Sequence, residues 1–548
     1  MSSEQSRILS SSAVMASGTI VSRMSGFFRS ILLAAALGAG LHADVFNISN
    51  TIPNMLYILL AGGIFNAVLV PQLVRAMKND ADGGEAYTNR IVTLAGLFLL
   101  GVTVLLVLAA PWVMQLFLAS DFNSPENAAQ RASVIDFARF CLPQVFFYGM
   151  FVLVGQILNA RGRFGPMMWA PIANNVISVA VLVVYLFVFG PATDTAGGFS
   201  SSQELLLGVG STVGIATQFL ILVPFLRAAG YSYRPRFDFR HTGLGHTLQL
   251  GVWTVLFVIV NQIAYTIVVK LASGGTAGNP DGTGYTVYSS AFLLVMVPHS
   301  IVTVSLATAI LPRLSASAAA ADLAGLARTL SSTLRTTLAL VLPFIMVLPV
   351  VAREISKVVW GYGAAADSYR NFAPSLALFA PGLLFFTVHY LMLRGFYSLE
   401  RTRTVFWVQC VVAATNIVVA LVLVGRTSAY DTSPALVIAY GCSYLVGASC
   451  SYLLLRHLLG GLDTALLVRF LVRMLLAAGA ATALAYGLAQ VLRGLFDSES
   501  LVASAATAAL VIGLDAVVFV VLARLLRISE VSEVVGVVTR RLPGSRVG

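Results

Sequence analysis

The stretch Ile91-Val-Thr-Leu-Ala-Gly-Leu-Phe-Leu-Leu-Gly-Val-Thr-Val-Leu-Leu-Val-Leu-Ala-Ala110 contains no charged residue and no proline. An α-helix rises about 1.5 Å per residue, so about 20 residues cross the roughly 30 Å hydrocarbon core of a bilayer. A segment this long and this apolar therefore predicts a membrane-spanning helix.

Runs of the same kind recur along the whole chain. Of the 548 residues, 58% are hydrophobic and only 10% are charged, so most of the chain cannot form the surface of a soluble protein. Lipid offers no partner to backbone N–H and C=O groups, which favours helices. We predict an all-α polytopic membrane protein of about fourteen transmembrane helices, at residues 12–38, 45–75, 91–119, 132–160, 166–190, 203–227, 243–273, 284–311, 328–352, 372–398, 404–425, 435–456, 465–492 and 500–524.

The distribution of positive charge predicts the orientation of the chain. With a cytoplasmic N-terminus, 20 of the 34 Lys and Arg residues fall on the cytoplasmic side and six on the outer side. This asymmetry follows the positive-inside rule and places both termini in the cytoplasm. It also explains the net charge of +11 without a nucleic-acid partner. The six outer residues are Arg131, Arg353, Lys357, Arg370, Arg426 and Arg493.

Matches at an offset of about 240 residues indicate an internal repeat. Pro71, at the end of the second predicted helix, corresponds to Pro312 at the end of the eighth, and Asn175 to Asn416. Gly155, Arg161 and Arg163 return in the same way as Gly395, Arg401 and Arg403. An even number of helices per repeat makes the repeats parallel, an arrangement that transporters use for alternating access.

The expected organisation is two six-helix repeats that form a central cavity, followed by two extra helices. We assign residues 1–11 to a cytoplasmic N-terminus, 12–230 to the first lobe and 231–460 to the second lobe. Residues 461–527 form the thirteenth and fourteenth helices, and residues 528–548 form a cytoplasmic tail.

Three basic residues within the predicted helices need an explanation, because a charge near the bilayer centre costs roughly 2.5 to 3.5 kcal/mol on insertion scales. On a helix, Arg23, Gly26 and Arg29 fall within an arc of about 120°. This face directs two guanidiniums at the cavity, and Lys270 lies late in the seventh predicted helix. Arginine binds phosphate through two parallel hydrogen bonds, so these residues predict an anionic ligand. The alternative is that Arg23 and Arg29 pair within the protein or reach the headgroups.

The other charged and titratable residues within the predicted helices have structural explanations. We expect Asp136 and Arg139 to form a local ion pair, since they are three positions apart on one helix. His299 and His389 are expected to be hydrogen-bonded packing residues. Four arginines near predicted helix ends are expected to extend to the headgroups, namely Arg335, Arg394, Arg469 and Arg473.

The N-terminal segments resemble the MurJ (MviN) family of the MOP transporter superfamily. The resemblance is carried by Ser22-Arg23-Met-Ser-Gly26-Phe-Phe-Arg29, Ala43-Asp44-Val-Phe46, Ile52-Pro53-Asn54 and Phe65-Asn-Ala-Val-Leu-Val-Pro71. It implies a flippase that moves lipid II, the undecaprenyl-pyrophosphate-linked precursor of peptidoglycan, to the outer leaflet of a bacterial cytoplasmic membrane. It implies that Arg23 and Arg29 contact the pyrophosphate.

The resemblance assigns further residues and partners. Asp44, at the start of the second helix, and the motif residues Ser22, Gly26 and Asn54 are expected in the substrate site together with Lys270. The thirteenth and fourteenth helices would form a groove for the polyprenyl tail. Cell-wall synthesis proteins are the macromolecular partners expected, and no cofactor or metal is expected. Coupling to the membrane potential or to a monovalent cation remains open.

The chain departs from the family pattern at several positions of the predicted cavity. Tyr57, Ile58 and Gly62 stand where the family usually has arginine or an acid, and Phe292, Leu293 and Met296 replace charged residues of the eighth helix. Asn416 matches one position of a sodium site described for some members. Ala420, one turn later, stands where an acid is required, which argues against sodium coupling.

Two other function classes compete with the lipid II flippase. An exporter of another polyprenyl-linked oligosaccharide, or a MATE-like drug exporter, would share the fold and the repeat. A membrane enzyme acting on polyprenyl phosphate would need a carboxylate cluster at a membrane face, and the loops contain none with that pattern. The chain also lacks a Walker A motif, so ATP is not the expected energy source.

We predict that Arg23→Ala and Arg29→Ala each abolish complementation of a lipid II flippase depletion strain, because each removes a phosphate-binding fork. Both variants should be inserted at the level of the unsubstituted chain, as measured by immunoblotting of membranes. Full growth with both variants would contradict the assigned pyrophosphate role.

Overall fold

The computed structural model describes residues 3–60, 73, 76–77, 82–192, 197–238, 244–279, 281–496, 500–533 and 536. Within these ranges all regular secondary structure is helical, as predicted. Twelve helical segments among the described residues are long and apolar enough to cross a membrane. The first two predicted spans correspond to helix α1 (Ser3–Leu37) and to helix α2 (Leu41–Ile58), and most of the second span beyond Leu60 lies outside the described residues.

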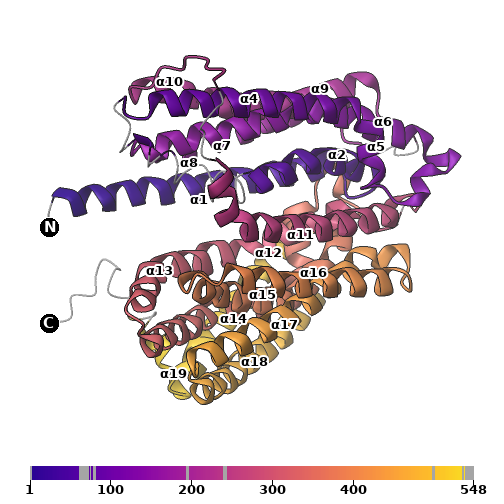
Figure 1. Ribbon diagram of the computed structural model, residues 1–548. Coiled ribbons are helices and arrows are strands. Elements are labelled where there is room, and N and C mark those ends of the chain that lie inside the picture. Colours follow the sequence, from indigo (N-terminus) through magenta and orange to yellow (C-terminus); the bar gives the residue numbers. More distant parts are fainter. Residues whose placement is uncertain are drawn as a thin grey trace. The chain divides into compact units, whose positions relative to one another are not determined.

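Figure 1 shows the helices that follow α2. In order they are α4 (Glu85–Leu108), α5 (Ala110–Gln115), η2 (Ser120–Asn123), η3 (Pro125–Asn127), α6 (Ala128–Cys141), α7 (Gln144–Ala160), α8 (Gly165–Phe189), α9 (Ser201–Leu220), α10 (Leu222–Ala228) and α11 (Leu244–Thr276). Next come α12 (Tyr285–Pro298), η4 (His299–Thr303), α13 (Val304–Ala319), α14 (Leu323–Trp360), η5 (Gly363–Ala365), η6 (Tyr369–Asn371), α15 (Phe372–Ser398), α16 (Thr402–Val424), η7 (Ala429–Asp431), α17 (Thr432–Leu459), α18 (Thr464–Leu495) and α19 (Leu501–Leu525).

The chain forms two compact units. Unit 1 comprises Met1–Thr286 with Tyr362–Ala365, and unit 2 comprises Val287–Gly361 with Ala366–Gly548. These units differ from the lobes expected from the repeat, whose boundary we placed between residues 230 and 231. The differences are α11, which packs against α2, and the segment Tyr362–Ala365, which contacts α1, so both belong to unit 1. Within each unit one helix packs on two others in the same way: α9 on α7 and α8, and α17 on α15 and α16.

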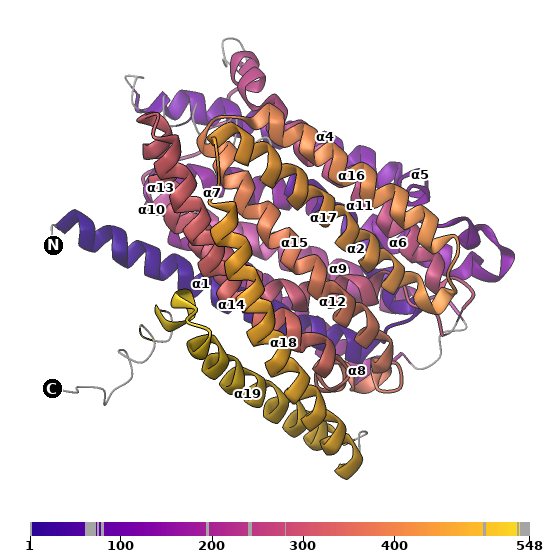
Figure 2. The same ribbon diagram turned by 90° about the horizontal axis from the view of Figure 1, so that it is seen from below.

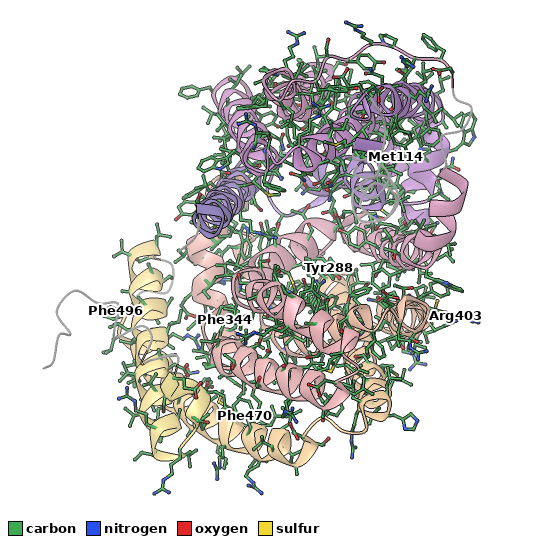
Figure 3. All side chains as sticks on the ribbon, turned by 60° about the vertical axis from the view of Figure 1, so that its left-hand side comes forward. Met114, Tyr288, Phe344, Arg403, Phe470 and Phe496 are labelled. Atoms are coloured by element: carbon green, nitrogen blue, oxygen red, sulfur yellow. The ribbon has the colours of Figure 1, made fainter. Side chains whose placement is uncertain are left out.

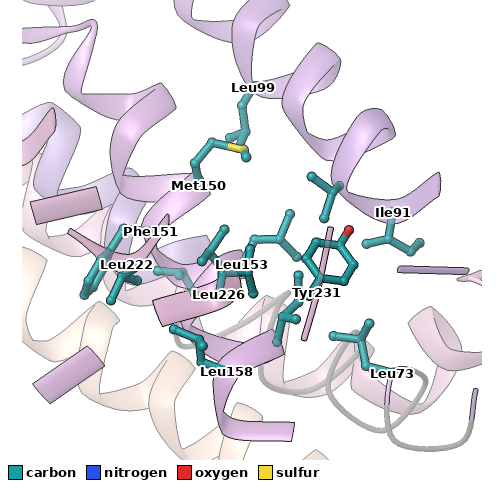
Figure 4. Close-up of a cluster of buried hydrophobic side chains, with 14 of the residues drawn as sticks. Leu73, Ile91, Leu99, Met150, Phe151, Leu153, Leu158, Leu222, Leu226 and Tyr231 are labelled. Carbon is teal, nitrogen blue, oxygen red and sulfur yellow. The ribbon is translucent and has the colours of Figure 1, made fainter. Parts of the chain in front are cut away.

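The core of unit 1 is a hydrophobic cluster from α4, α7 and α10 (Figure 4). Leu99 of α4 packs at Gly149 of α7, where an added Cβ would lie 2.4 Å from a Leu99 methyl carbon. Tyr231, just after α10, closes the cluster and donates a hydrogen bond of 2.7 Å from its Oη to Asn89 Oδ1. A small residue at the helix contact and a satisfied tyrosine hydroxyl allow this close packing.

The segment that follows Tyr231 lies along α4. The N–H group of Arg234 donates to Asn89 Oδ1, and the N–H group of Arg236 donates to Thr93 Oγ1. Asp238 accepts a hydrogen bond of 2.8 Å from Arg90 Nε, and this bond holds the pKa of the Asp238 carboxyl below its usual range. The polar first turns of α4 thus hold the segment against unit 1.

In unit 2, α15 and α17 pack extensively against each other. An added Cβ at Gly382 would lie 2.9 Å from Tyr440 and 3.4 Å from the backbone of Gly441. The hydroxyls of Ser375 and Ser433 form a hydrogen bond of 2.7 Å across the same interface. Small residues and interhelical hydrogen bonds replace the hydrophobic effect, which lipid does not supply. In Figure 3, Tyr288 lies among the helices of this unit and Arg403 at its edge.

The last two helices, α18 and α19, pack against each other and against α14 (Figure 2). Arg493 near the end of α18 forms a bidentate ion pair with Glu354 of α14, with N···O distances of 2.7 and 2.9 Å. Asp515 of α19 is buried and accepts a hydrogen bond of 3.0 Å from Thr482 of α18. Polar contacts between helices therefore fix this region to the rest of unit 2.

Two of the four arginines expected to extend to the headgroups are bound within the protein instead. Arg335 pairs with Glu530, whose neighbours Ile528 and Val531 are buried, so the beginning of the predicted tail folds back on α14. Arg394 donates to the hydroxyl of Tyr390 and lies 4.3 Å from the centroid of its ring. The partner of Arg335 lies 195 positions away in the chain, which hydropathy does not reveal, whereas the partner of Arg394 lies one turn away on the same helix.

The predictions for the histidines and for the helix ion pair are confirmed. Arg139 Nη1 lies 2.9 Å from Asp136 Oδ1. His299 is buried with its Nδ1 3.2 Å from Thr387 Oγ1. His389 is buried with its Nδ1 3.1 Å from the carbonyl oxygen of Gly447. Both histidines therefore serve in packing between helices.

We expect Gly382→Val to lower the unfolding free energy by about 1 to 3 kcal/mol, because the larger side chain overpacks the contact between α15 and α17. The measurement is the melting temperature of the purified protein in detergent. Gly487→Val is the matched control, since Gly487 is an exposed helical residue with open space around its Cβ position. Equal melting temperatures for the two variants would contradict the close contact.

Candidate functional site

Arg29 lines a pocket of about 70 Å³ inside unit 1. The walls come from α1, α2, α8 and α9. The pocket is polar on several sides and apolar on the others, and the remaining lining residues are Leu33, Phe46, Asn47, Asn50, Ser178, Val181, Leu182, Leu207 and Ser211. Among the described residues, none that lines the pocket is acidic.

Neutral polar and aromatic side chains surround Arg29. Tyr148 of α7 lies near the Arg29 guanidinium, and the Tyr148 ring lies 4.8 Å from that of Tyr57, centroid to centroid. Gln144 Nε2 donates a hydrogen bond of 3.0 Å to Asn50 Oδ1, which orients the Asn50 amide at the pocket wall. Within the part of the chain that the structure describes, Arg29 has no ion pair. Its charge is thus available to an anionic ligand.

Helix α1 is held in place near this pocket by Asn175 of α8. Asn175 Nδ2 donates to the Ser22 carbonyl oxygen at 3.0 Å and to Ser25 Oγ at 2.8 Å. Gly26 faces the same amide, which lies 3.6 Å from the position of an added Cβ. Ser22 and Gly26 therefore position α1 through backbone contacts. Arg23 is exposed, and no described residue forms an ion pair with it.

Asp44 is fully buried and caps the N-terminus of α12. Its Oδ2 accepts hydrogen bonds from Thr276 Oγ1 at 2.7 Å and from the Tyr285 N–H at 3.1 Å. Its Oδ1 accepts from the Thr286 N–H at 2.6 Å. Gly284 allows this approach, because an added Cβ would lie 1.9 Å from Asp44 Oδ2. In this conformation the carboxylate holds α2, α11 and the start of α12 together.

Lys270 lies in a different pocket of unit 1, which has a volume of about 610 Å³. This pocket also contains Arg131, Ser120 and Asn123, and Arg131 Nη1 donates a hydrogen bond of 3.0 Å to Asn123 Oδ1. It shares no lining residue with the Arg29 pocket. The structure therefore does not bring Lys270 and Arg29 together in this conformation.

The two predicted asparagines differ in burial. Asn54 is exposed on α2. Asn416 of α16 has a buried Oδ1 without a hydrogen-bond partner among the described residues, and Ala420, one turn later, is fully buried. The described residues contain no cluster of three or more His, Cys, Asp or Glu side chains that could hold a metal ion.

Sequence reasoning missed the neutral polar residues that complete the Arg29 site. Asn47 and Asn50 lie one turn or less apart on α2, and Ser178 and Ser211 come from α8 and α9. Single uncharged polar residues in apolar helices are common, so each one alone gives a weak signal. The only neutral polar residues that the repeat analysis of the sequence identified were Asn175 and Asn416, which lie 241 positions apart.

A family model described as "Lipid II flippase MurJ" matches residues 33–506 of the chain. The chain belongs to the MurJ family. The "Probable lipid II flippase MurJ" of Vibrio cholerae serotype O1 is 28% identical over 421 residues, which cover 75% of this chain and 77% of that protein. The "Lipid II flippase MurJ" of Burkholderia cenocepacia is 27% identical over 392 residues, which cover 70% and 72%. The matched residues include the α2, α8 and α9 walls of the Arg29 pocket, and Arg29 itself lies four positions before the match begins.

Solved structures agree on the fold. A "Lipid II flippase MurJ, inward closed conformation" matches with a TM-score of 0.71 at 16% identity, covering 92% of this chain and 98% of that chain. A multidrug resistance MATE family transporter of the MOP superfamily in its inward-facing conformation matches with a TM-score of 0.61 at 14% identity, covering 81% and 98%. The fold of this MurJ-family chain is thus shared with MOP transporters that carry other cargo.

We expect Asp44→Asn to reduce the unfolding free energy by about 1 to 3 kcal/mol, because an amide nitrogen cannot accept the hydrogen bonds of one carboxylate oxygen. The measurement is the melting temperature in detergent. Asp281→Asn, at an exposed carboxylate in the loop before α12, should leave that temperature unchanged. A stable Asp44→Asn variant with lost complementation would instead assign the carboxylate directly to transport.

Proposed function

We propose that this chain translocates lipid II from the inner to the outer leaflet of a bacterial cytoplasmic membrane. The observation that carries the proposal is Arg29, which lies in a polar pocket of a MurJ-family fold and has no ion pair among the described residues. An unpaired guanidinium in a membrane protein is costly unless a ligand or water compensates it. The family relationship supplies the identity of that ligand.

The pocket supports an anionic cargo over a cationic one. The Arg29 fork presents two parallel donors to a phosphate, and the amides of Asn47 and Asn50 add neutral donors and acceptors. A cationic drug would need a carboxylate here, and no described lining residue is acidic. This favours the flippase over a MATE-like exporter of cationic drugs. A different polyprenyl-linked oligosaccharide would satisfy the same pocket and is the second candidate.

Alternating access is the mechanism that we propose for the movement. Parallel repeats in transporters rock against each other around a fixed binding site. Cargo that carries negative charge outward gains roughly 2.3 kcal/mol per net charge per 100 mV of inside-negative potential. We therefore propose that the membrane potential drives the outward movement of the anionic cargo. Coupling to a monovalent cation at Asn416 is the alternative driving force, and the alanine at position 420 disfavours it.

We further propose that both termini are cytoplasmic and that α18 and α19 accommodate the polyprenyl tail. The charge asymmetry of the loops supports the orientation. Large apolar side chains exposed along both helices support the second proposal, including Leu476 and Leu484 on α18 and Val517 and Val521 on α19. Cell-wall synthesis proteins would then receive the cargo at the outer leaflet.

The direct test is depletion of this protein, followed by measurement of labelled lipid II that is accessible at the outer leaflet. We expect accessible lipid II to fall at least tenfold while total lipid II rises. Re-expression of the unsubstituted chain should restore accessibility, and the Arg29→Ala variant should not. Unchanged accessibility after depletion, with loss of another polyprenyl-linked glycan from the surface, would favour the second candidate.

A further inference from the structure

The segment that connects α10 to α11 is rich in arginine and aromatic residues. It begins Tyr231-Ser-Tyr-Arg-Pro-Arg-Phe-Asp238, and these eight residues have no regular secondary structure. In Figure 1 it leaves the end of α10 and runs beside α4. The N–H groups of Arg234 and Arg236 donate to side chains of α4, and Pro235 between them has no N–H group. The backbone is therefore bound to α4, while residues 232–238 remain exposed.

The segment contacts α4 at the predicted membrane boundary. Its hydrogen bonds reach Asn89 and Thr93, and the third predicted span begins between these two residues, at residue 91. An α-helix rises about 1.5 Å per residue, so the two contacts are about 6 Å apart along α4. That distance matches the thickness of one headgroup layer, roughly 5 to 8 Å. With this boundary, the exposed side chains of the segment lie at headgroup level.

The ends of α7 and α10 lie beside the segment. Arg161, just after α7, donates from Nη1 to the Ala229 carbonyl oxygen at 3.1 Å, and its guanidinium carbon lies 5.2 Å from the centroid of the Tyr231 ring. Arg163 follows Arg161 by two residues, and Arg227 precedes Ala229 by two residues. Both are exposed and lie at the predicted ends of the fourth and sixth spans. They therefore extend the basic surface of the segment.

Four arginines of this surface are available to a ligand. Each is exposed, and its guanidinium makes no ion pair or hydrogen bond with a described residue; they are Arg163, Arg227, Arg234 and Arg236, which we call the arginine patch. The carboxylates of Asp82 and Asp238 interact with Arg236 at longer range, and Asp238 is bound by Arg90. The donors of the arginine patch are thus largely unused within unit 1.

The surrounding segments remain positive when every residue of the sequence is counted. Residues 75–90, 161–163 and 227–240 together contain nine Lys or Arg residues and four Asp or Glu residues, a balance of +5. This count includes the residues of these segments that lie outside the described ranges. The surface therefore attracts anions, and each free guanidinium can form two parallel hydrogen bonds with phosphate oxygens.

Exposed aromatic side chains among the arginines favour a membrane surface as the partner. Phe237 is 69% exposed and Tyr233 is 46% exposed. Phe164 and Phe225, near the other two arginines, are exposed as well. Aromatic side chains gather at membrane–water interfaces, and basic residues next to a membrane span attract anionic lipids. A headgroup layer accommodates both the rings and the charges of this surface.

We propose that the arginine patch binds the phosphates of anionic phospholipids in the leaflet at this end of unit 1. Arg234 and Arg236 contact the phosphate oxygens from the segment beside α4, and Arg163 and Arg227 contact them from the ends of α7 and α10. With the predicted orientation this is the cytoplasmic leaflet. The bound lipids hold the connection between α10 and α11 at the membrane surface. The proposal does not depend on the identity of the cargo.

The test is native mass spectrometry of the purified full-length protein in detergent, titrated with phosphatidylglycerol or phosphatidylcholine. We expect phosphatidylglycerol to bind at least fivefold more tightly, and Arg234→Gln with Arg236→Gln to weaken its binding at least fivefold. Hydrogen exchange in nanodiscs gives the location of the lipid. Backbone amides of residues 231–238 should exchange more slowly in phosphatidylglycerol than in phosphatidylcholine, and the double variant should lose this difference.

Arg313→Gln with Arg328→Gln is the matched control. These arginines are exposed on α13 and α14 of unit 2, on the predicted cytoplasmic side, so the control removes the same charge and should change binding less than twofold. An equal loss of binding in the control would reveal only a general attraction to positive charge and would overturn the assignment to the arginine patch. No preference for phosphatidylglycerol would overturn it too. So would binding of poly-glutamate that phosphatidylglycerol does not displace, which would indicate an acidic protein partner.

Discussion

The structure depends on one constraint: a polar group placed among lipid-facing helices must find its partner inside the protein. Several charged side chains among the described residues have such a partner. Arg493 pairs with Glu354, Arg335 with Glu530, and Asp515 bonds to Thr482. Each partnership joins two helices or a helix and a distant segment, so satisfying a charge also determines which elements pack together.

Arg29 is the informative departure from this rule. Its pocket contains amide and hydroxyl groups but no carboxylate among the described residues, so no acid at the pocket wall neutralises its charge. Asp44 shows the opposite case, a buried carboxylate whose oxygens are occupied by three hydrogen bonds. The first arrangement suits reversible binding of an anion, and the second suits a fixed connection between helices. Burial alone would not distinguish the two roles.

The fold itself does not determine the cargo. Structures of a lipid II flippase and of multidrug transporters both match this chain at low identity, which shows a common architecture and nothing more. The family assignment rests on the sequence match over residues 33–506. The preference for an anionic cargo comes from the Arg29 pocket itself. It contains a guanidinium, and none of its described lining residues is acidic.

The sequence by itself determined the all-helical membrane fold, the approximate number of spans and the family, because these follow from apolar length and from short motifs that each lie within one segment. It also named Arg29 as a candidate, together with Arg23 and Lys270, and it identified Asp136 with Arg139 as a local pair. Tertiary structure decided which distant groups meet. The separation of Lys270 from Arg29, the capping of α12 by Asp44 and the pairing of Arg335 with Glu530 each depend on contacts between segments far apart in the chain. Such contacts are set by helix packing, which hydropathy and spacing within a single segment do not encode.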